Sequence, residues 1–255
     1  MKIYFINLDR AEDRRIVTER ALDGLDHERV AAIDGRQNPP TKKGLNRFQI
    51  ACIDSHRIAW RKFLATPDAF ACFLEDDLHF SPEFRGFVSE EDWIPTDADA
   101  VKLDSFYNKV MIGAPRPAPL GRALARLYTR HESSAAYILS RAGAARFLRL
   151  TENPARPVDY ILFPEDPIGE NIVGYQLTPA VAVQDSRYEQ HHAPGHQFES
   201  AIARIDSTKP AEPLPRAWFV LKRETIRIFR DIGRAKRYLV NRLVRRLNPE
   251  IIPFR

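Results

Sequence analysis

Residues 69–77 read AFACFLEDD, six apolar residues followed directly by three acidic ones. An uninterrupted apolar run of this length is typical of a strand that is covered on both faces. The run therefore predicts a central strand over residues 69–74, with Glu75, Asp76 and Asp77 just beyond its carboxyl end. Ligands of open α/β sheets bind at that end of the strands, so the acidic residues mark the first candidate site.

The sequence on either side of this run alternates between strand-like and helix-like patterns. Strands are predicted over residues 2–8, 29–33, 101–103 and 181–184, an antiparallel-looking pair over 124–129 and 135–139, and helices over 12–22, 46–64 and 141–150. Asn46 and Gln49 have the spacing of a capping box, which marks the start of the long helix. Ile16, Val17 and Ala21 are expected to form the buried face of the first helix. This alternation predicts an α/β domain around a mostly parallel sheet, completed by later hairpin elements.

The charge of the 255-residue chain is divided unevenly. From Arg216 onward there are 12 Lys or Arg and 3 Asp or Glu, a net charge of +9, whereas the first 215 residues hold 27 basic and 31 acidic residues. Apolar residues recur at helix spacing between the basic ones, which is typical of an amphipathic helix on an anionic membrane. We therefore expect a domain over residues 1–207, a Pro-rich linker over 208–215 and a basic helical tail over 216–255.

Two alternatives to membrane attachment remain for this tail, a helix docked on the domain and a nucleic-acid-binding segment. No recognised nucleic-acid-binding module accompanies the tail, so a nucleic acid partner is not expected. No apolar run approaches the roughly 18 to 20 residues that span a bilayer, and the first residues do not look like a secretory signal. Cys52 and Cys72 lie in apolar segments, as reduced core cysteines do. The expected location is the cytoplasm, peripherally at the inner membrane face.

Acidic residues follow three of the predicted strands, at Asp9, at 75–77 and at Asp104. Adjacent carboxylates repel one another, and oxygen-only ligands suit Mg²⁺ or Mn²⁺, ions that typically bridge carboxylates to substrate phosphates. A solvated acidic turn that caps the next helix is the alternative interpretation of residues 75–77. Neither a G-x-x-x-x-G-K-[ST] loop nor a G-x-G-x-x-G motif is present, which excludes P-loop enzymes and weakens the case for a dinucleotide-dependent oxidoreductase.

Several short motifs occur in a specific order along the chain. They are Asn7-Leu8-Asp9-Arg10, Asp13-Arg14-Arg15, Cys52-x-x-Ser55-His56 with Trp60, Leu74-Glu75-Asp76-Asp77, Lys102-Leu103-Asp104, residues 136–141 with Gly143-Ala144, Pro157-Val158-Asp159, Gln184, and Glu199-Ser200-x-Ile202. Together they resemble glycosyltransferase family 25, the lipooligosaccharide-type sugar transferases related to the collagen galactosyltransferases. The resemblance covers residues 1–205 and departs from the family pattern at Ala51, where a glycine is expected before the cysteine.

The resemblance implies a GT-A-type fold with a DxD-like metal motif. It also implies transfer of a sugar, often galactose, from a UDP-sugar to a glycolipid or glycan acceptor, with inversion. Asp77 is then the expected ligand of a divalent cation, Mn²⁺ or Mg²⁺, with His191 or His192 as a candidate further ligand. Contacts to the donor are expected from six residues: Asn7, Asp9, Arg14, His56, Glu75 and Asp76.

Glycosyl transfer also needs a carboxylate that accepts the proton of the acceptor hydroxyl. Asp159 is the preferred base, because it follows Pro157 in the later part of the chain, where acceptors bind in such folds. A helix N-cap is the competing role for Asp159. Asp104 is the alternative base or a contact to the donor. The competing function is a non-catalytic relative that binds a nucleotide sugar or a glycan.

Overall fold

The computed structural model describes residues 1–37, 44–191, 233, 235, 236 and 238–255. The chain divides into two compact units. The first consists of Met1–Phe198 together with Pro249–Arg255, and the second is Glu199–Asn248. The chain therefore leaves the first unit and re-enters it before residue 255.

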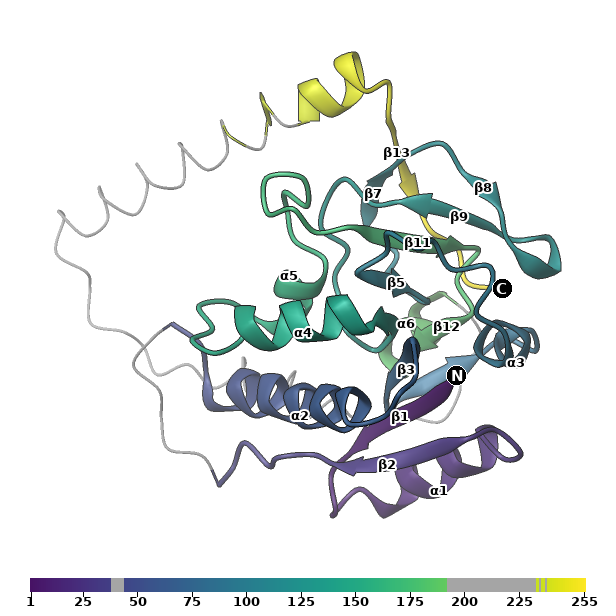
Figure 1. Cartoon of the computed structure of the whole chain (residues 1–255), viewed down its shortest axis with the longest axis vertical. Helices are drawn as coiled ribbons and strands as arrows, with labels where there is room; N and C mark the ends of the chain where they lie inside the picture. The colour runs from purple at the N-terminus through teal and green to yellow at the C-terminus, as the bar shows by residue number, and fades with distance from the viewer. Residues whose placement is uncertain (38–43, 192–232, 234, 237) are drawn as a thin grey trace, which may run out of the picture. The chain divides into compact units, whose positions relative to one another are not determined.

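An eight-stranded sheet forms the centre of the first unit (Figure 1). In spatial order its strands are β2 (His27–Ala31), β1 (Lys2–Asn7), β3 (Phe70–Glu75), β10 (Ala136–Ser140), β5 (Ala100–Lys102), β11 (Gly174–Thr178), β9 (Ala123–Arg126) and β8 (Arg116–Pro117). A 3-10 turn, η1 (Pro119–Gly121), links β8 to β9. Strand β1 is parallel to β2 and β3, and β11 is parallel to β5.

The sheet is mixed, so the expectation of a mostly parallel sheet is confirmed only in part: β2, β1, β3, β5 and β11 run in one direction. Strand β10 is antiparallel to both β3 and β5, and β9 is antiparallel to both β11 and β8. A parallel neighbour needs a crossover that returns the chain to the start of the sheet. The residues before β10 instead lie at the carboxyl end of β3, where the Glu75 amide donates to the Ala135 carbonyl at 2.8 Å. The expected antiparallel pair is also absent among the described strands, since β5 and β11 separate β9 from β10.

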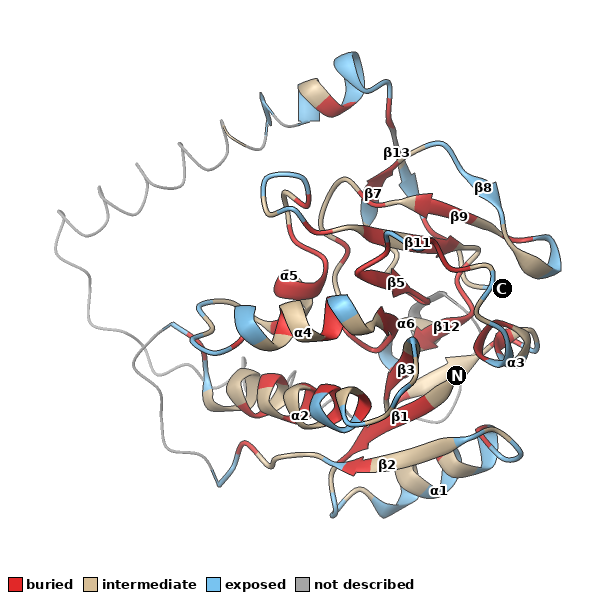
Figure 2. Cartoon of the chain, in the orientation of Figure 1, coloured by how far each residue is buried: buried red, intermediate tan, exposed pale blue. Residues whose placement is uncertain are grey.

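Two apolar clusters cover the two faces of this sheet. Helices lie on both sides: α1 (Glu12–Ala21), α2 (Arg47–Leu64), α3 (Phe84–Ser89), α4 (Arg141–Leu150) and α5 (Val158–Leu162). Successive strand residues point to opposite faces. Tyr4 and Ile6 accordingly join the cluster with α2, α4 and α5, whereas Ile3 and Phe5 join the cluster with α3. The central strands β1, β3, β10 and β5 are therefore mostly buried, whereas the edge strands β2 and β8 are not, and α1 is largely exposed (Figure 2).

The capping box predicted for α2 is present. The Asn46 side chain accepts hydrogen bonds from the Phe48 and Gln49 amides at 3.0 and 2.9 Å, and the Gln49 side chain accepts from the Asn46 amide at 2.9 Å. The helix ends at Leu64, as predicted. Its buried face carries His56 and Trp60 against the sheet.

Two smaller sheets adjoin the central one. The first has the order β4 (Leu78–Phe80), β12 (Ala182–Gln184) and β6 (Asp104–Ser105), with α6 (Asp185–His191) directly after β12. The second pairs β7 (Lys109–Ile112) with β13 (Asn248–Ile251). The expected helical tail over 216–255 is therefore wrong at its end, because Pro249 and Pro253 cannot continue a helix and Ile252 is buried in the first unit.

The described part of the second unit contains a short π-helix, η3 (Val240–Val244). The predicted linker over 208–215 and the helical pattern over 216–232 lie outside the described residues. Within the described ranges, no helix is both long enough and apolar enough to cross a membrane.

Candidate active site

The carboxyl ends of β1 and β3 and the start of β10 meet at one edge of the central sheet. Ile6 pairs with Glu75, and Leu74 pairs with Ala136. Because β10 is antiparallel, the residues just before it lie at the same edge as the acidic residues 75–77. The edge predicted to hold the ligand therefore contains residues from three separate parts of the sequence.

Asp76 binds residues of β1 and α1. Its Oδ2 accepts a hydrogen bond from Asn7 Nδ2 at 2.7 Å, and its Oδ1 accepts one from Arg14 at 3.0 Å. Burial raises the pKa of Asp76, although Arg14 and Asn7 act against this rise. Asp76 thus contacts two other predicted donor-binding residues, whereas Asp9, another of them, is largely exposed and pairs with Arg29.

Glu75 contacts a different set of residues from those that bind Asp76. Ser134 Oγ donates to Glu75 Oε1 at 2.8 Å, and His56 Nε2 lies 3.6 Å from the same oxygen. Burial favours a higher pKa for Glu75, but His56 and Ser134 outweigh it and hold the pKa below its usual value. The His56 ring is itself oriented by a 2.7 Å contact between its Nδ1 and the Tyr137 hydroxyl. That hydroxyl also accepts from Trp60 Nε1 at 2.9 Å.

Among the carboxylates of this edge, Asp77 has the pKa that is shifted furthest from its usual value. Gln184 Nε2, at the end of β12, lies 3.4 Å from both Asp77 Oδ1 and Glu75 Oε2. Burial, followed by the negative charges of Glu75 and Asp76, raises the pKa of Asp77 to about 7. The carboxylates are therefore close enough to repel one another, and a bound cation would offset this repulsion.

In the described part of the chain, one group of three donor atoms lies close enough together to hold a metal: those of Cys52, His56 and Glu75, which are within 4.8 Å of one another. Asp77, the predicted metal ligand, is not part of this group. Burial, together with the charge of Glu75, raises the pKa of the Cys52 thiol well above its usual value, which opposes the thiolate that metal binding requires. The side chain of His191 and all of His192, the other predicted ligands, lie outside the described residues.

Asp104 and Lys102 form a fully buried ion pair. Lys102 Nζ donates to Asp104 Oδ1 at 2.8 Å and to the Ser133 carbonyl at 2.6 Å. No described residue hydrogen-bonds Asp104 Oδ2. Burial raises the pKa of Asp104, and the charge of Lys102 opposes that rise. Because its exposed fraction is 0%, Asp104 does not reach an acceptor hydroxyl in this conformation.

Asp159 lies in the first turn of α5 and is partly exposed. Its Oδ2 accepts from the Ser133 amide at 3.3 Å, which links it to the Lys102–Asp104 pair. Burial raises the pKa of Asp159 and so makes it a better proton acceptor near neutral pH. Pro157, and not Asp159, is the N-cap of α5, so the competing role as an N-cap is wrong.

Sequence reasoning did not identify several polar residues of this edge. Ser133, Ser134 and Tyr137 belong to β10 or precede it, and their place depends on the direction of that strand. Lys102 and Gln184 belong to recognisable motifs, Lys102 within a predicted strand and Gln184 at the end of one, and these motifs could have identified them as site residues.

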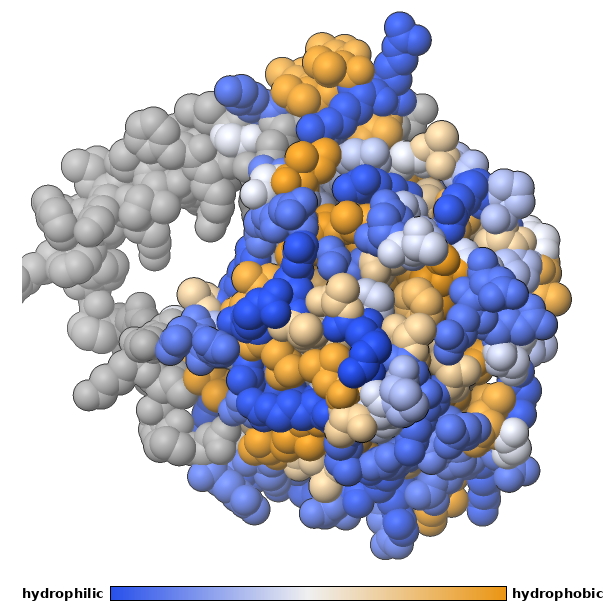
Figure 3. Space-filling model, viewed as in Figure 1, coloured by the Kyte–Doolittle hydropathy of each residue, from blue (hydrophilic) through white to orange (hydrophobic). Residues whose placement is uncertain are grey.

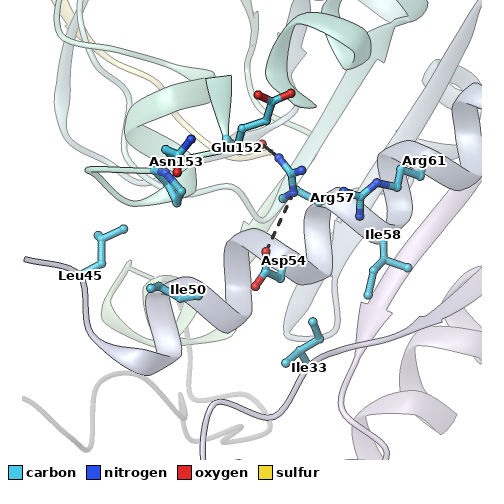
Figure 4. Close-up of a pocket in the computed structure, with 11 residues that line it drawn as sticks. Ile33, Leu45, Ile50, Asp54, Arg57, Ile58, Arg61, Glu152 and Asn153 are labelled. Atoms are coloured by element: carbon cyan, nitrogen blue, oxygen red, sulfur yellow. Dashed lines mark hydrogen bonds and ion pairs between the residues drawn. The ribbon is translucent and has the colours of Figure 1, made fainter. Parts of the chain in front are cut away.

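A separate cavity of about 760 Å³ lies between α2 and residues 151–154 (Figure 4). Its lining is Ile33, Leu45, Ile50, Asp54, Arg57, Ile58, Arg61, Thr151, Glu152, Asn153 and Pro154. Arg57 reaches across to Thr151 Oγ1 at 2.6 Å. The view in Figure 3 shows small groups of hydrophobic side chains among hydrophilic ones. None of the predicted site residues lines the cavity, so it is distinct from the acidic edge.

Comparison with known proteins gives matches over most of the chain. The model of a family described as "Glycosyltransferase family 25 (LPS biosynthesis protein)" matches residues 1–162. The lacto-N-neotetraose biosynthesis glycosyltransferase LgtB of Neisseria meningitidis is 25% identical over 243 residues, which are 90% of this chain and 85% of that protein. The lipooligosaccharide biosynthesis protein lic2B of Haemophilus influenzae is 25% identical over 204 residues, 74% of each chain.

Among solved structures, a glycosyltransferase involved in the glycosylation of the major capsid of PBCV-1 aligns with a TM-score of 0.38 and 13% identity. That alignment covers 74% of this chain and 96% of the other. The residues matched by the family model include every predicted site residue other than His191 and His192.

Proposed function

The chain belongs to glycosyltransferase family 25, and on that premise we propose that it transfers a hexose from a UDP-sugar to a lipopolysaccharide or related glycan. The proposal includes a divalent cation at Asp77 and inversion at the anomeric carbon. The single observation that carries it is a pair of carboxylates, buried Asp77 and partly exposed Glu75, that approach one Gln184 amide while the pKa of Asp77 is raised to about 7.

The cation is proposed to bind between Asp77 and Glu75. Carboxylate oxygens are the ligands that Mg²⁺ and Mn²⁺ prefer, and a cation here would remove the repulsion that raises the pKa of Asp77. When bound, the ion supplies positive charge to the diphosphate that leaves with UDP. Gln184 then orients both carboxylates, because its amide lies at the same distance from each.

Asp159 is proposed as the general base. It is partly exposed and its pKa is raised, whereas Asp104 is fully buried and bound to Lys102. A base that deprotonates the acceptor hydroxyl allows direct displacement of UDP, which inverts the anomeric carbon. We assign Asp104 to the support of the site through its contact with the Ala136 amide at 3.3 Å.

The donor is proposed to bind near Asn7, Arg14 and Asp76, since Arg14 brings a positive charge to this edge. The acceptor proposal draws on the names of the relatives, which refer to lacto-N-neotetraose and lipooligosaccharide biosynthesis.

The basic segment, residues 216–248, is proposed to attach to an anionic, cytoplasmic membrane face. It holds 11 Lys or Arg and 2 Asp or Glu, and Leu243 and Val244 in its described part are exposed.

The test is transfer or hydrolysis of a panel of UDP-sugars with and without Mn²⁺. We expect release of UDP that depends on Mn²⁺ and is lost in Asp77→Asn, because the diphosphate then lacks its counter-charge. Asp13→Asn, a matched change on the exposed side of α1, should behave as the wild type. Binding of UDP without release of sugar from any donor would favour the second candidate, a non-catalytic relative that binds nucleotide sugars.

A further inference from the structure

Residues 249–255, here called the C-terminal strap, are packed into the first unit although the second unit precedes them. Ile252 is fully buried and joins the same apolar cluster as Val110, Ile112 and Ala180. Its neighbour Ile251 is half exposed, at 51%. The strap therefore buries Ile252 in the core while its neighbour Ile251 faces away from it.

Backbone hydrogen bonds join the strap to the segment that leads into β12. The Ala180 amide donates to the Pro253 carbonyl at 2.7 Å, and the Arg255 amide donates to the Ala180 carbonyl at 3.3 Å. Arg122, which is nearly buried, donates to the carbonyls of Arg255 and Pro179 at 2.7 and 2.9 Å. The segment just before β12 is thus bound both by the strap and by Arg122.

A second contact joins the strap to β6. Ser105 Oγ donates to the Ile252 carbonyl at 2.5 Å, and Ser105 directly follows Asp104. Strand β12 pairs with β6 through Ala182 opposite Asp104 and Val183 opposite Ser105. The strap therefore contacts β6 and the segment just before β12, the strand that pairs with β6.

Strand β12 ends at Gln184, the residue whose amide approaches Asp77 and Glu75. The strap also reaches α6, which follows β12. The Phe254 ring meets the Tyr188 ring edge to face at 6.1 Å, and Tyr188 stacks on His79 at 4.1 Å. His79 Nε2 in turn lies 2.5 Å from Asp185 Oδ1, next to Gln184. The strap therefore contacts the chain on both sides of Gln184, at Ala180 before it and at Tyr188 after it.

We propose that the C-terminal strap is a positioning element of the transferase site: it holds β6 and β12 in place and so sets the Gln184 amide against the Asp77 and Glu75 carboxylates. The proposal rests on the proposed function, because the cation is the ligand that these carboxylates would bind. It also makes the basic segment an insertion that leaves and re-enters one unit. Removing everything after residue 215 would then damage the site as well as any membrane attachment.

The test compares Ile252→Ala with Ile251→Ala, a matched truncation of the exposed neighbour. Two quantities are measured, amide hydrogen exchange and the Mn²⁺ concentration that gives half-maximal UDP release. Ile252→Ala should speed exchange at residues 103–106 and 180–185 and leave β1 and β2 unchanged. The Mn²⁺ requirement should rise about 10- to 100-fold, as for other residues that orient metal ligands, with little change in the acceptor KM. Ile251→Ala should match the wild type, and Ile252→Val should restore both quantities.

Deletion of residues 249–255 provides a second variant in case Ile252→Ala has a small effect. A synthetic peptide of residues 248–255, added to the deleted protein, should restore protection of residues 180–185 and lower the Mn²⁺ requirement. Unchanged exchange at β12 in both variants would overturn the proposal. So would exchange that rises equally in β1, β2 and β12, because the strap would then support only global stability. A wild type without transferase activity would refute the proposed function, and the exchange pattern would still decide the role of the strap.

Discussion

Replacing Asp77 by asparagine should stabilise the metal-free protein at alkaline pH. The usual pKa of this carboxyl, 3.8, is raised to about 7 in the fold. Between these values the native state keeps a proton that the unfolded state has lost, so stability falls as the pH rises through this window. Above pH 7 the native state must hold a buried charge beside Glu75. This difference in pKa lowers the free energy of unfolding by on the order of 4 kcal/mol once the pH exceeds 7. Asparagine removes the charge and keeps a side chain that Gln184 can contact.

Thermal unfolding in the presence of a chelator, from pH 5 to pH 8.5, measures this effect. In a domain of this size 1 kcal/mol shifts the Tm by about 2–4 °C, so the Asp77→Asn protein should melt several degrees above the wild type at pH 8. The gap should close toward pH 5. Mn²⁺ should raise the Tm of the wild type at pH 8 and leave the variant unchanged. Asp13→Asn, at an exposed position of α1, should follow the wild type throughout.

A variant that melts below the wild type at pH 8 would refute this reasoning, because Asp77 would then stabilise the fold as an ionised group. A wild-type Tm that stays constant from pH 5 to pH 8 would refute it as well. Equal stabilisation of both proteins by Mn²⁺ would place the ion away from Asp77.

Three further predictions concern the base, the ion and the basic segment. Asp159→Asn should lower kcat by about 10²- to 10⁴-fold and leave UDP-sugar binding unchanged, and near-normal turnover would transfer the role of base to another residue. Cys52→Ser should leave the Mn²⁺ dependence of activity unchanged, whereas loss of that dependence would move the ion to the Cys52–His56–Glu75 group. Glutamine at the Lys and Arg positions of residues 216–248, with the strap kept intact, should release the protein from anionic vesicles in low-salt sedimentation, because each basic residue contributes about 1 kcal/mol. Vesicle binding that survives these changes would contradict electrostatic attachment.

Local signals in the sequence were sufficient to predict the elements whose residues interact mainly with near neighbours in the chain. The capping box of Asn46 and Gln49 is a contact across three residues, so the start of α2 could be predicted from its own residues. The apolar run before Glu75 likewise predicted β3 and the acidic edge. The family motifs supplied expected roles for Asp77, Asp104 and Asp159 without any knowledge of how these residues meet.

The tertiary structure decided which surfaces face each other. In α1 the expected buried residues Ile16 and Val17 are 37% and 40% exposed, whereas Thr18 is buried beside Asp76. A helix pattern does not state which element will cover it, and α1 has no strong apolar face of its own. The direction of β10, which brings Ser133 and Ser134 to the acidic edge, depended on the order of the whole sheet.

The three acidic residues 75–77 illustrate the same division. Their sequence predicted repulsion and a cation, but only the fold separates Asp76, which is bound by Asn7 and Arg14, from Glu75 and Asp77, which face Gln184. The C-terminal strap is the extreme case, because its partners Ser105 and Ala180 lie far away along the chain. An apolar segment carries no local signal of which distant surface will bury it, since that surface exists only once the rest of the domain has folded.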